Sequence, residues 1–277
     1  MTDDISFESA PLIEIVAELR WLPVGMQPVA LPLQQQIIIG GGGTDITLFN
    51  FARQPEIIPF TKAERLIPEG FPAPWHQVVW RFRDPSNTAV LLQIGAGIFT
   101  ANALQPYRRW SEFRPTVENG VRAFLASRPE NEHQQPFVGL TLRYINGFSS
   151  GLLGGMTANQ FARDVLGFKI TPPPAFQALY ANAEEGSASA NLLIPIANTA
   201  KTMNLQIGDG SIRPVGSTED SPAAMLDMTV AETKPVAPTL EAVMACLDTS
   251  RDIIHTAFVD LTKPIHDRMK PQQGKSQ

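Results

Sequence analysis

Cysteine and long apolar runs are the scarcest features of this 277-residue chain. The single cysteine, Cys246, excludes an intramolecular disulfide and a cysteine-rich metal site, and it suits a reducing compartment. No apolar run approaches the roughly 20 residues that a membrane span needs, and the acidic start Met1–Asp4 lacks the pattern of a signal peptide. The sequence therefore predicts a cytoplasmic protein that neither spans a membrane nor binds a metal or cofactor.

Basic charge is also in short supply. The formal net charge is −5, with 11 basic and 14 acidic residues in 1–138 and 11 and 13 in 139–277. Nucleic-acid-binding proteins concentrate basic side chains on one surface, because their affinity comes from neutralising phosphates. Nucleic acid is accordingly not an expected partner.

Known catalytic motifs are missing as well. The only glycine cluster, Gly40–Gly43, leads into Thr44-Asp45 and an apolar stretch, whereas a phosphate-binding loop needs Gly-Lys-Ser/Thr; it predicts a flexible hairpin loop. His255 and His266 are eleven residues apart with Pro264 between them, which is the wrong spacing for a helical metal pair.

Two further residues of the closing segment have side chains capable of chemistry. Asp252 lies one helical turn before His255 and could orient its ring, as an Asp–His pair at a surface or interface. Cys246, within a helix beside apolar positions, is expected to be a small buried hydrophobe rather than a reactive thiol.

What the chain has in surplus is turn residues. Its 24 Pro and 20 Gly make about 16% of the sequence, against roughly 12% on average. Alternating apolar residues predict strands between these turns, at 11–21, 36–39, 46–51, 77–83, 89–94, 98–103, 137–146, 175–183, 188–196, 203–207 and 224–232. Apolar residues three and four apart predict helices, at 110–124 with Ser111 as N-cap, at 157–166 with a capping box from Thr157 and Gln160, and at 239–262.

These elements predict an α+β fold, with antiparallel sheets in two similar halves that each pack against a helix. The rigid Pro172–Pro174 separates residues 1–171 from residues 172–277, which include the closing helix and a frayed polar tail after Met269. The long loops 53–76 and 147–156 are the first places to expect a binding surface.

Seven residues are candidates for binding: Arg81, Arg83, Arg108, Arg109, Arg143, Asp252 and His255. Arg81 and Arg83 share a strand face and Arg143 lies on another strand, which fits either a ladder of cross-strand ion pairs or an Arg-lined groove for an acidic ligand or partner. Arg108 and Arg109 stand between Tyr107 and Trp110, a mixture found on nucleic-acid surfaces and also at the start of a helix.

The chain resembles a sporadically distributed family of prokaryotic proteins with no established activity. The resemblance is carried by Pro11–Trp21, by Tyr107–Trp110 with Phe113, by Gly139–Asn146 and by the closing helix around His255 and Phe258. It spans roughly residues 8–262 and departs from the family pattern at Thr141-Leu142. It implies no catalytic residue or cofactor, and the patchy distribution hints at mobile or defence-related gene systems.

Asp4–Glu8 and Val90–Thr100 are in turn similar to the opening and meander of SecB-like chaperones. The sequence thus leaves three hypotheses. The first is a non-enzymatic protein–protein interaction module that binds another protein, or itself as a homo-oligomer, through an exposed sheet face or groove. The second is a SecB-like chaperone for unfolded or toxin clients, and the third is an enzyme or small-ligand-binding protein with an Arg-lined groove.

Overall fold

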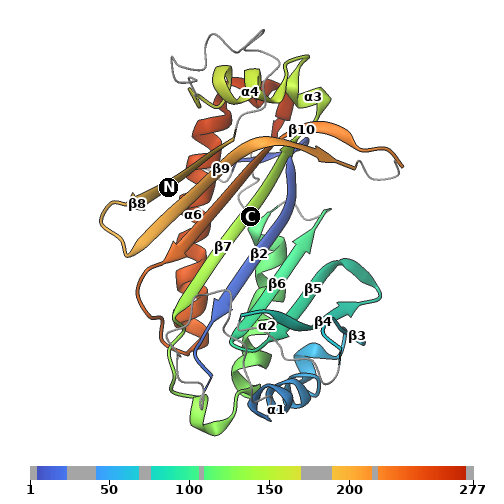
Figure 1. The fold of residues 1–277 in the computed structure, drawn as a ribbon, viewed down its shortest axis with the longest axis vertical. Coiled ribbons are helices and arrows are strands. Elements are labelled where there is room, and N and C mark those ends of the chain that lie inside the picture. Colours follow the sequence, from blue (N-terminus) through green and yellow to red (C-terminus); the bar gives the residue numbers. More distant parts are fainter. Residues whose placement is uncertain are drawn as a thin grey trace. The chain divides into compact units, whose positions relative to one another are not determined.

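The computed structural model of the chain describes residues 5–23, 42–68, 76–105, 109–169, 189–213 and 218–272 (Figure 1). The strands are β1 (Ser6–Phe7), β2 (Leu12–Arg20), β3 (Lys62–Arg65), β4 (Val78–Asp84), β5 (Asn87–Gly95), β6 (Ile98–Leu104), β7 (Gly139–Phe148), β8 (Ala190–Ile196), β9 (Lys201–Ile212), β10 (Ser221–Glu232) and β11 (Pro271–Gln272). The helices are α1 (Gly42–Phe51), α2 (Trp110–Ser127), α3 (Ser150–Leu153), α4 (Ala158–Asp164), α6 (Leu240–Thr262) and α7 (His266–Met269), with 3₁₀ turns at Pro55–Ile57, Glu130–Glu132 and Lys263–Ile265.

Nine of these strands form one sheet in the order β3-β4-β5-β6-β2-β7-β10-β9-β8, and β1 pairs with β11. The predicted α+β class with antiparallel strands is confirmed. None of the described helices is long and apolar enough to cross a membrane.

The chain divides into two compact units, each made of separate stretches of sequence. One comprises residues 1–14, 143–230 and 251–277, and the other residues 15–142 and 231–250, so that β2, β7, β10 and α6 contribute to both. The predicted boundary at Pro172–Pro174 and the predicted strand at 175–183 lie outside the described residues, and the division into two similar halves stays a prediction.

In the unit of residues 15–142 and 231–250, the antiparallel hairpins β4–β5 and β5–β6 set the core. Residues on one face of these strands, including Phe82, Leu92, Phe99 and Ala101, are at most 4% exposed. Helix α2 lies against β6, with the Phe124 ring stacked on Phe99 at 5.2 Å between centroids. The helix comes so close that a Cβ on Gly120 would lie 3.0 Å from both Leu92 and Phe99.

In the other unit, helix α4 lies against β9. The predicted capping box of α4 is confirmed, because Gln160 N donates to Thr157 Oγ1 at 3.2 Å and Thr157 N donates to Gln160 Oε1 at 2.9 Å. Gly167 then takes the left-handed conformation that ends the turn, with φ at 76°.

Several local predictions were wrong. Residues 46–51 belong to helix α1 rather than to a strand, with buried Thr47, Leu48 and Phe51 at helical spacing. Gly42 and Gly43 begin that helix.

The N-cap of α2 is Arg109 and not Ser111, and the Arg109 side chain makes no capping hydrogen bond. The segment after Met269 is not wholly frayed, since Pro271 and Gln272 pair with β1. The predicted strand at 36–39 lies outside the described residues.

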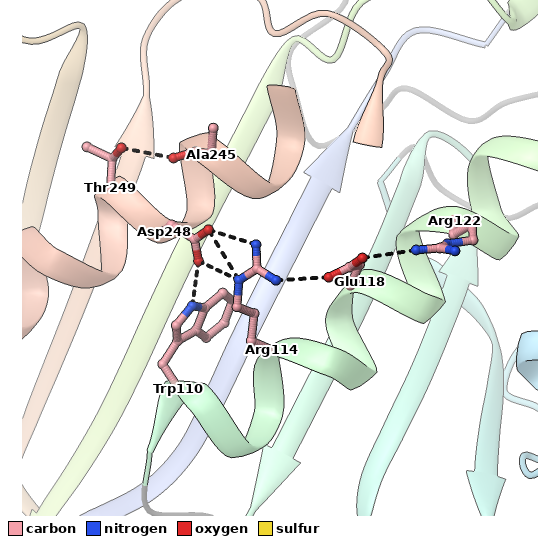
Figure 2. A network of polar contacts seen from close by, with 7 residues as sticks. All are labelled: Trp110, Arg114, Glu118, Arg122, Ala245, Asp248 and Thr249. Carbon is pink, nitrogen blue, oxygen red and sulfur yellow. Dashed lines mark hydrogen bonds and ion pairs between the residues drawn. The ribbon is translucent and has the colours of Figure 1, made fainter. Parts of the chain in front are cut away.

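A polar network fastens α2 to the first half of α6 (Figure 2). Asp248 accepts hydrogen bonds from Trp110 Nε1 at 2.7 Å and from Arg114, whose Nε and Nη2 lie 3.0 and 2.9 Å from its two carboxylate oxygens. Arg114 also bonds Glu118, which accepts from Arg122 at 2.9 Å. The hydrogen bonds with Asp248 raise the pKa of Arg114, so this guanidinium stays charged in the network.

Replacing Asp248 with Ala should lower the free energy of unfolding by about 1–3 kcal/mol, because Trp110 and Arg114 lose their shared acceptor. Denaturant unfolding measures this loss. The control is Asp252→Ala on the same helix, where the carboxylate is 71% exposed and pairs with Arg251; its effect should stay within about 0.5 kcal/mol. Equal effects of the two substitutions would contradict the role given to the network.

Candidate functional site

The outer strands β3 and β4 carry the densest set of basic side chains on the described part of the meander. Lys62, Arg65, Arg81 and Arg83 lie on them, with Glu64 and Asp84 as the only acidic residues of the two strands. Strand β3 falls inside the loop 53–76 that was expected to hold a binding surface, and all four of its residues are exposed. It also stands at one end of the strand order.

Antiparallel pairing decides which of these side chains share a face. Lys62 is opposite Arg83, Glu64 is opposite Arg81, and Arg81 is opposite Gln93 on β5. Because side chains alternate between faces, Lys62, Glu64, Arg81 and Arg83 all project from one face, opposite to that of Phe82. We call these four residues the cationic edge.

The charges of the cationic edge are unequally paired. Arg81 Nη1 lies 3.7 Å from Glu64 Oε2, while Arg81 Nε is buried and has no hydrogen-bond partner among the described residues. Lys62 and Arg83 face each other across the strands, and neither has an ion pair with a described residue. Two like charges directly opposite each other destabilise a sheet, so an anion placed between them would be bound favourably.

Polar groups continue from the cationic edge across the same face of β5 and β6. Gln93 is opposite Thr100, whose hydroxyl lies 3.1 Å from Gln93 Oε1 and 2.8 Å from Asn102 Oδ1. Thr100 and Asn102 are 4% and 8% exposed. The row of Arg81, Gln93 and Thr100 is therefore polar, whereas buried Leu91 separates Arg83 from Asn102 on the same face.

The other predicted site residues are placed elsewhere. Arg143 on β7 makes a bidentate ion pair with Asp227 on β10, with Nε 2.8 Å from Oδ2. This is a cross-strand pair of the kind predicted as one alternative.

On α6, Asp252 pairs with Arg251 at 3.0 Å and is largely exposed, and His255 is half-buried one turn later. Arg109 is the residue that precedes α2, and Arg108 lies outside the described residues. In the strand order, β5, β6 and β2 stand between β4 and β7, so Arg81 and Arg143 are not on adjacent strands.

A buried charged cluster that the sequence did not reveal follows α2. The Arg128 side chain is fully buried, its guanidinium lies 5.2 Å from the Phe137 ring centre, and its Nη1 donates to the Gln135 carbonyl at 3.1 Å. Glu132, 4.0 Å from Arg128 Nε, accepts a hydrogen bond from Trp21 Nε1 at 2.9 Å. Burial lowers the pKa of Arg128, and the charge of Glu132 opposes that shift. The hydrogen bonds of Arg128 and Glu132 connect the segment after α2 to Gln135 and Trp21.

Two expectations from the sequence concern a metal site and the thiol of Cys246. In the described part of the chain, no three His, Cys, Asp or Glu residues are placed to hold a metal ion. Cys246 is half-buried and not the buried hydrophobe that was expected, since its thiol lies 3.7 Å from Glu232 Oε2 as a hydrogen-bond donor.

Replacing Lys62 with Glu should raise the free energy of unfolding by about 0.2–1 kcal/mol, because a like-charged cross-strand pair becomes an opposite-charged one. Chemical denaturation measures the change, with Lys62→Gln as the control that removes the repulsion without adding attraction. Lys62→Glu should be the most stable of the three proteins, followed by Lys62→Gln and then the wild type. A Lys62→Glu variant less stable than Lys62→Gln would show that Lys62 does not face Arg83.

His76, just before β4, should make the stability of the fold depend on pH. Burial lowers its pKa from the ordinary value of 6.5, and the charge of Arg20 lowers it further. Below pH 6.5 the unfolded chain therefore binds more protons at this residue than the folded chain, and the free energy of unfolding falls as the pH falls toward the lowered pKa. His76→Asn, which tolerates the left-handed φ of 56°, should lose this component when melting temperatures are compared above and below pH 6.5. An unchanged pH profile in the variant would rule out this assignment.

No protein-family model matches this chain, and no curated protein matches it either. Function must therefore be inferred from the cationic edge itself.

Proposed function

We propose that this protein is a binding module that recognises an acidic, extended segment of another protein at the cationic edge. The observation that carries the proposal is the pairing of Lys62 with Arg83, two cations held opposite each other on outer strands without a described carboxylate partner. Such a pair lowers the stability of the sheet, whereas a bound carboxylate would relieve its repulsion.

The form of the surface supports an extended ligand. The outer edge of a terminal strand offers unpaired backbone N–H and C=O groups, to which a peptide strand can add. Main-chain hydrogen bonds would then supply affinity, and alternate acidic side chains of the peptide would reach Lys62 and Arg83 on one face. Arg81, whose partly exposed side chain lies 3.7 Å from Glu64, adds positive charge on that face.

A simpler role for these charges is protection of the sheet edge, since natural edge strands often carry lysine to prevent aggregation. The two roles differ in one respect. Protection needs charge of either sign, so a glutamate would serve as well as Lys62, whereas recognition of an acidic segment requires positive charge.

The test uses a labelled peptide of alternating Glu and Thr, with an alternating Lys and Thr peptide of the same length as its control. Fluorescence anisotropy of the intact protein should show binding of the acidic peptide only, weakening as salt screens the charges. Lys62→Glu/Arg83→Glu should lower the affinity by at least about tenfold, a loss of about 1.4 kcal/mol.

The matched control is Arg122→Glu/Arg163→Glu, which makes the same charge change at two cations that pair with Glu118 and Asp164. It should leave the affinity within about twofold of the wild type, a change of under about 0.5 kcal/mol. An N-methylated acidic peptide, unable to donate alternate backbone hydrogen bonds, should bind weakly if it adds as a strand. Equal losses in the two double variants would reduce the effect to net charge and overturn the proposal.

The other hypotheses drawn from the sequence stay predictions. They are a SecB-like chaperone, an enzyme or small-ligand-binding protein, a cytoplasmic location and a link to mobile or defence gene systems. The cationic edge bears on both the protein–protein interaction hypothesis and the acidic-ligand hypothesis. The exposed strand β3 at the end of the strand order favours the first, because an extended peptide can add to it.

A further inference from the structure

The strand at the other end of the sheet order, β8, is apolar and exposed. Leu193 is 74% exposed, and its neighbours Leu192 and Ile194 are 44% and 39% exposed. No residue of Ala190–Ile196 is charged, so β8 lacks the basic side chains that mark the cationic edge. A terminal strand that is apolar and uncharged is the kind of edge to which another strand adds.

In the unit that contains β8 and β9, the layer of apolar side chains ends at β8. Strand β8 pairs with β9 in a regular antiparallel register, in which Leu192 is opposite Leu205 and Ile194 is opposite Met203. Met203 and Leu205 are 4% and 5% exposed, so the buried row of β9 continues onto β8 and there meets solvent. One more strand beyond β8 would complete that row.

We propose that the strand that completes it is β8 of a second copy of this chain, antiparallel to the first and centred on Leu193. The sequence of β8 suits pairing with itself. About a two-fold axis at Leu193, Leu192 of each copy faces Ile194 of the other, Ala190 faces Ile196, and Leu193 faces Leu193. Every facing pair except Asn191 with Pro195 is apolar, and no like charges meet.

Pro195 weakens this arrangement without preventing it. A proline lacks the backbone N–H of a ladder, so on β8 its nitrogen points away from β9. Its nitrogen is then directed to the outer edge together with those of Asn191 and Leu193. With the axis at Leu193, the two Leu193 residues form a hydrogen-bonded pair. Each Asn191 N–H can then donate to the Pro195 carbonyl of the other copy. The missing N–H of Pro195 therefore costs one hydrogen bond on each side of the axis.

Cysteine cross-linking tests this register in a Cys246→Ala background. Leu193→Cys should form a disulfide-linked dimer under mild oxidation, because residues of a hydrogen-bonded antiparallel pair have Cα atoms about 5.5 Å apart, within disulfide range. Leu192→Cys, displaced by two residues from its own counterpart, should cross-link poorly. Ile58→Cys, at a residue that is 71% exposed in the other unit, controls for random collision.

Analytical ultracentrifugation provides the second arm. The wild type should sediment as a dimer, and Leu193→Lys should sediment as a monomer with unchanged circular dichroism, because two lysines would face each other at the axis. Ile58→Lys should remain dimeric. A monomeric wild type, or preferential cross-linking at residue 192 or 58, would overturn the proposal and leave this edge to a strand from a different protein. None of these variants alters the cationic edge, so failure here and failure of acidic-peptide binding are separate results.

Discussion

The register of the β3–β6 meander is the constraint on which the cationic edge and the core beneath it both depend. Because side chains alternate strictly, one alignment sends Phe82, Leu92 and Ala101 into the core and directs Lys62 and Arg83 to the opposite face. A slip of one residue would bury the charges and expose the apolar side chains. The close approach of α2 at Gly120 and the stacked rings of Phe99 and Phe124 hold the core side of that alignment.

The two strands at the ends of the nine-stranded sheet order, β3 and β8, carry different kinds of side chain. Strand β3 is short, charged and fully exposed, and β8 is uncharged with three large apolar side chains in solvent. Edge strands with these two compositions favour different neighbours, since charge selects a complementary ligand and bare apolar surface selects another apolar strand. The proposed dimer edge and the proposed acidic-segment edge can therefore operate independently.

Sequence periodicity predicted the helices and strands that have one buried face and one exposed face. Alternation indicated β2 and the β4–β6 hairpins, and three-and-four spacing indicated α2 and α6. It failed at α1, because a short apolar stretch such as 46–51 does not distinguish a strand from a helix. It also failed at β3, whose four exposed residues carry no apolar pattern and are ordered by pairing with β4. The opposition of Lys62 and Arg83 depends on that pairing between distant segments, so no local signal in the sequence could reveal it.

Hydrogen–deuterium exchange across residues 61–66, with and without the alternating Glu and Thr peptide, tests the central claim most directly. If an acidic segment adds as a strand at the cationic edge, the peptide should slow backbone amide exchange in β3 and leave β8 and α4 unchanged. This protection should vanish in the Lys62→Glu/Arg83→Glu variant. Unchanged exchange in β3 at saturating peptide, or protection confined to another element, would contradict the account.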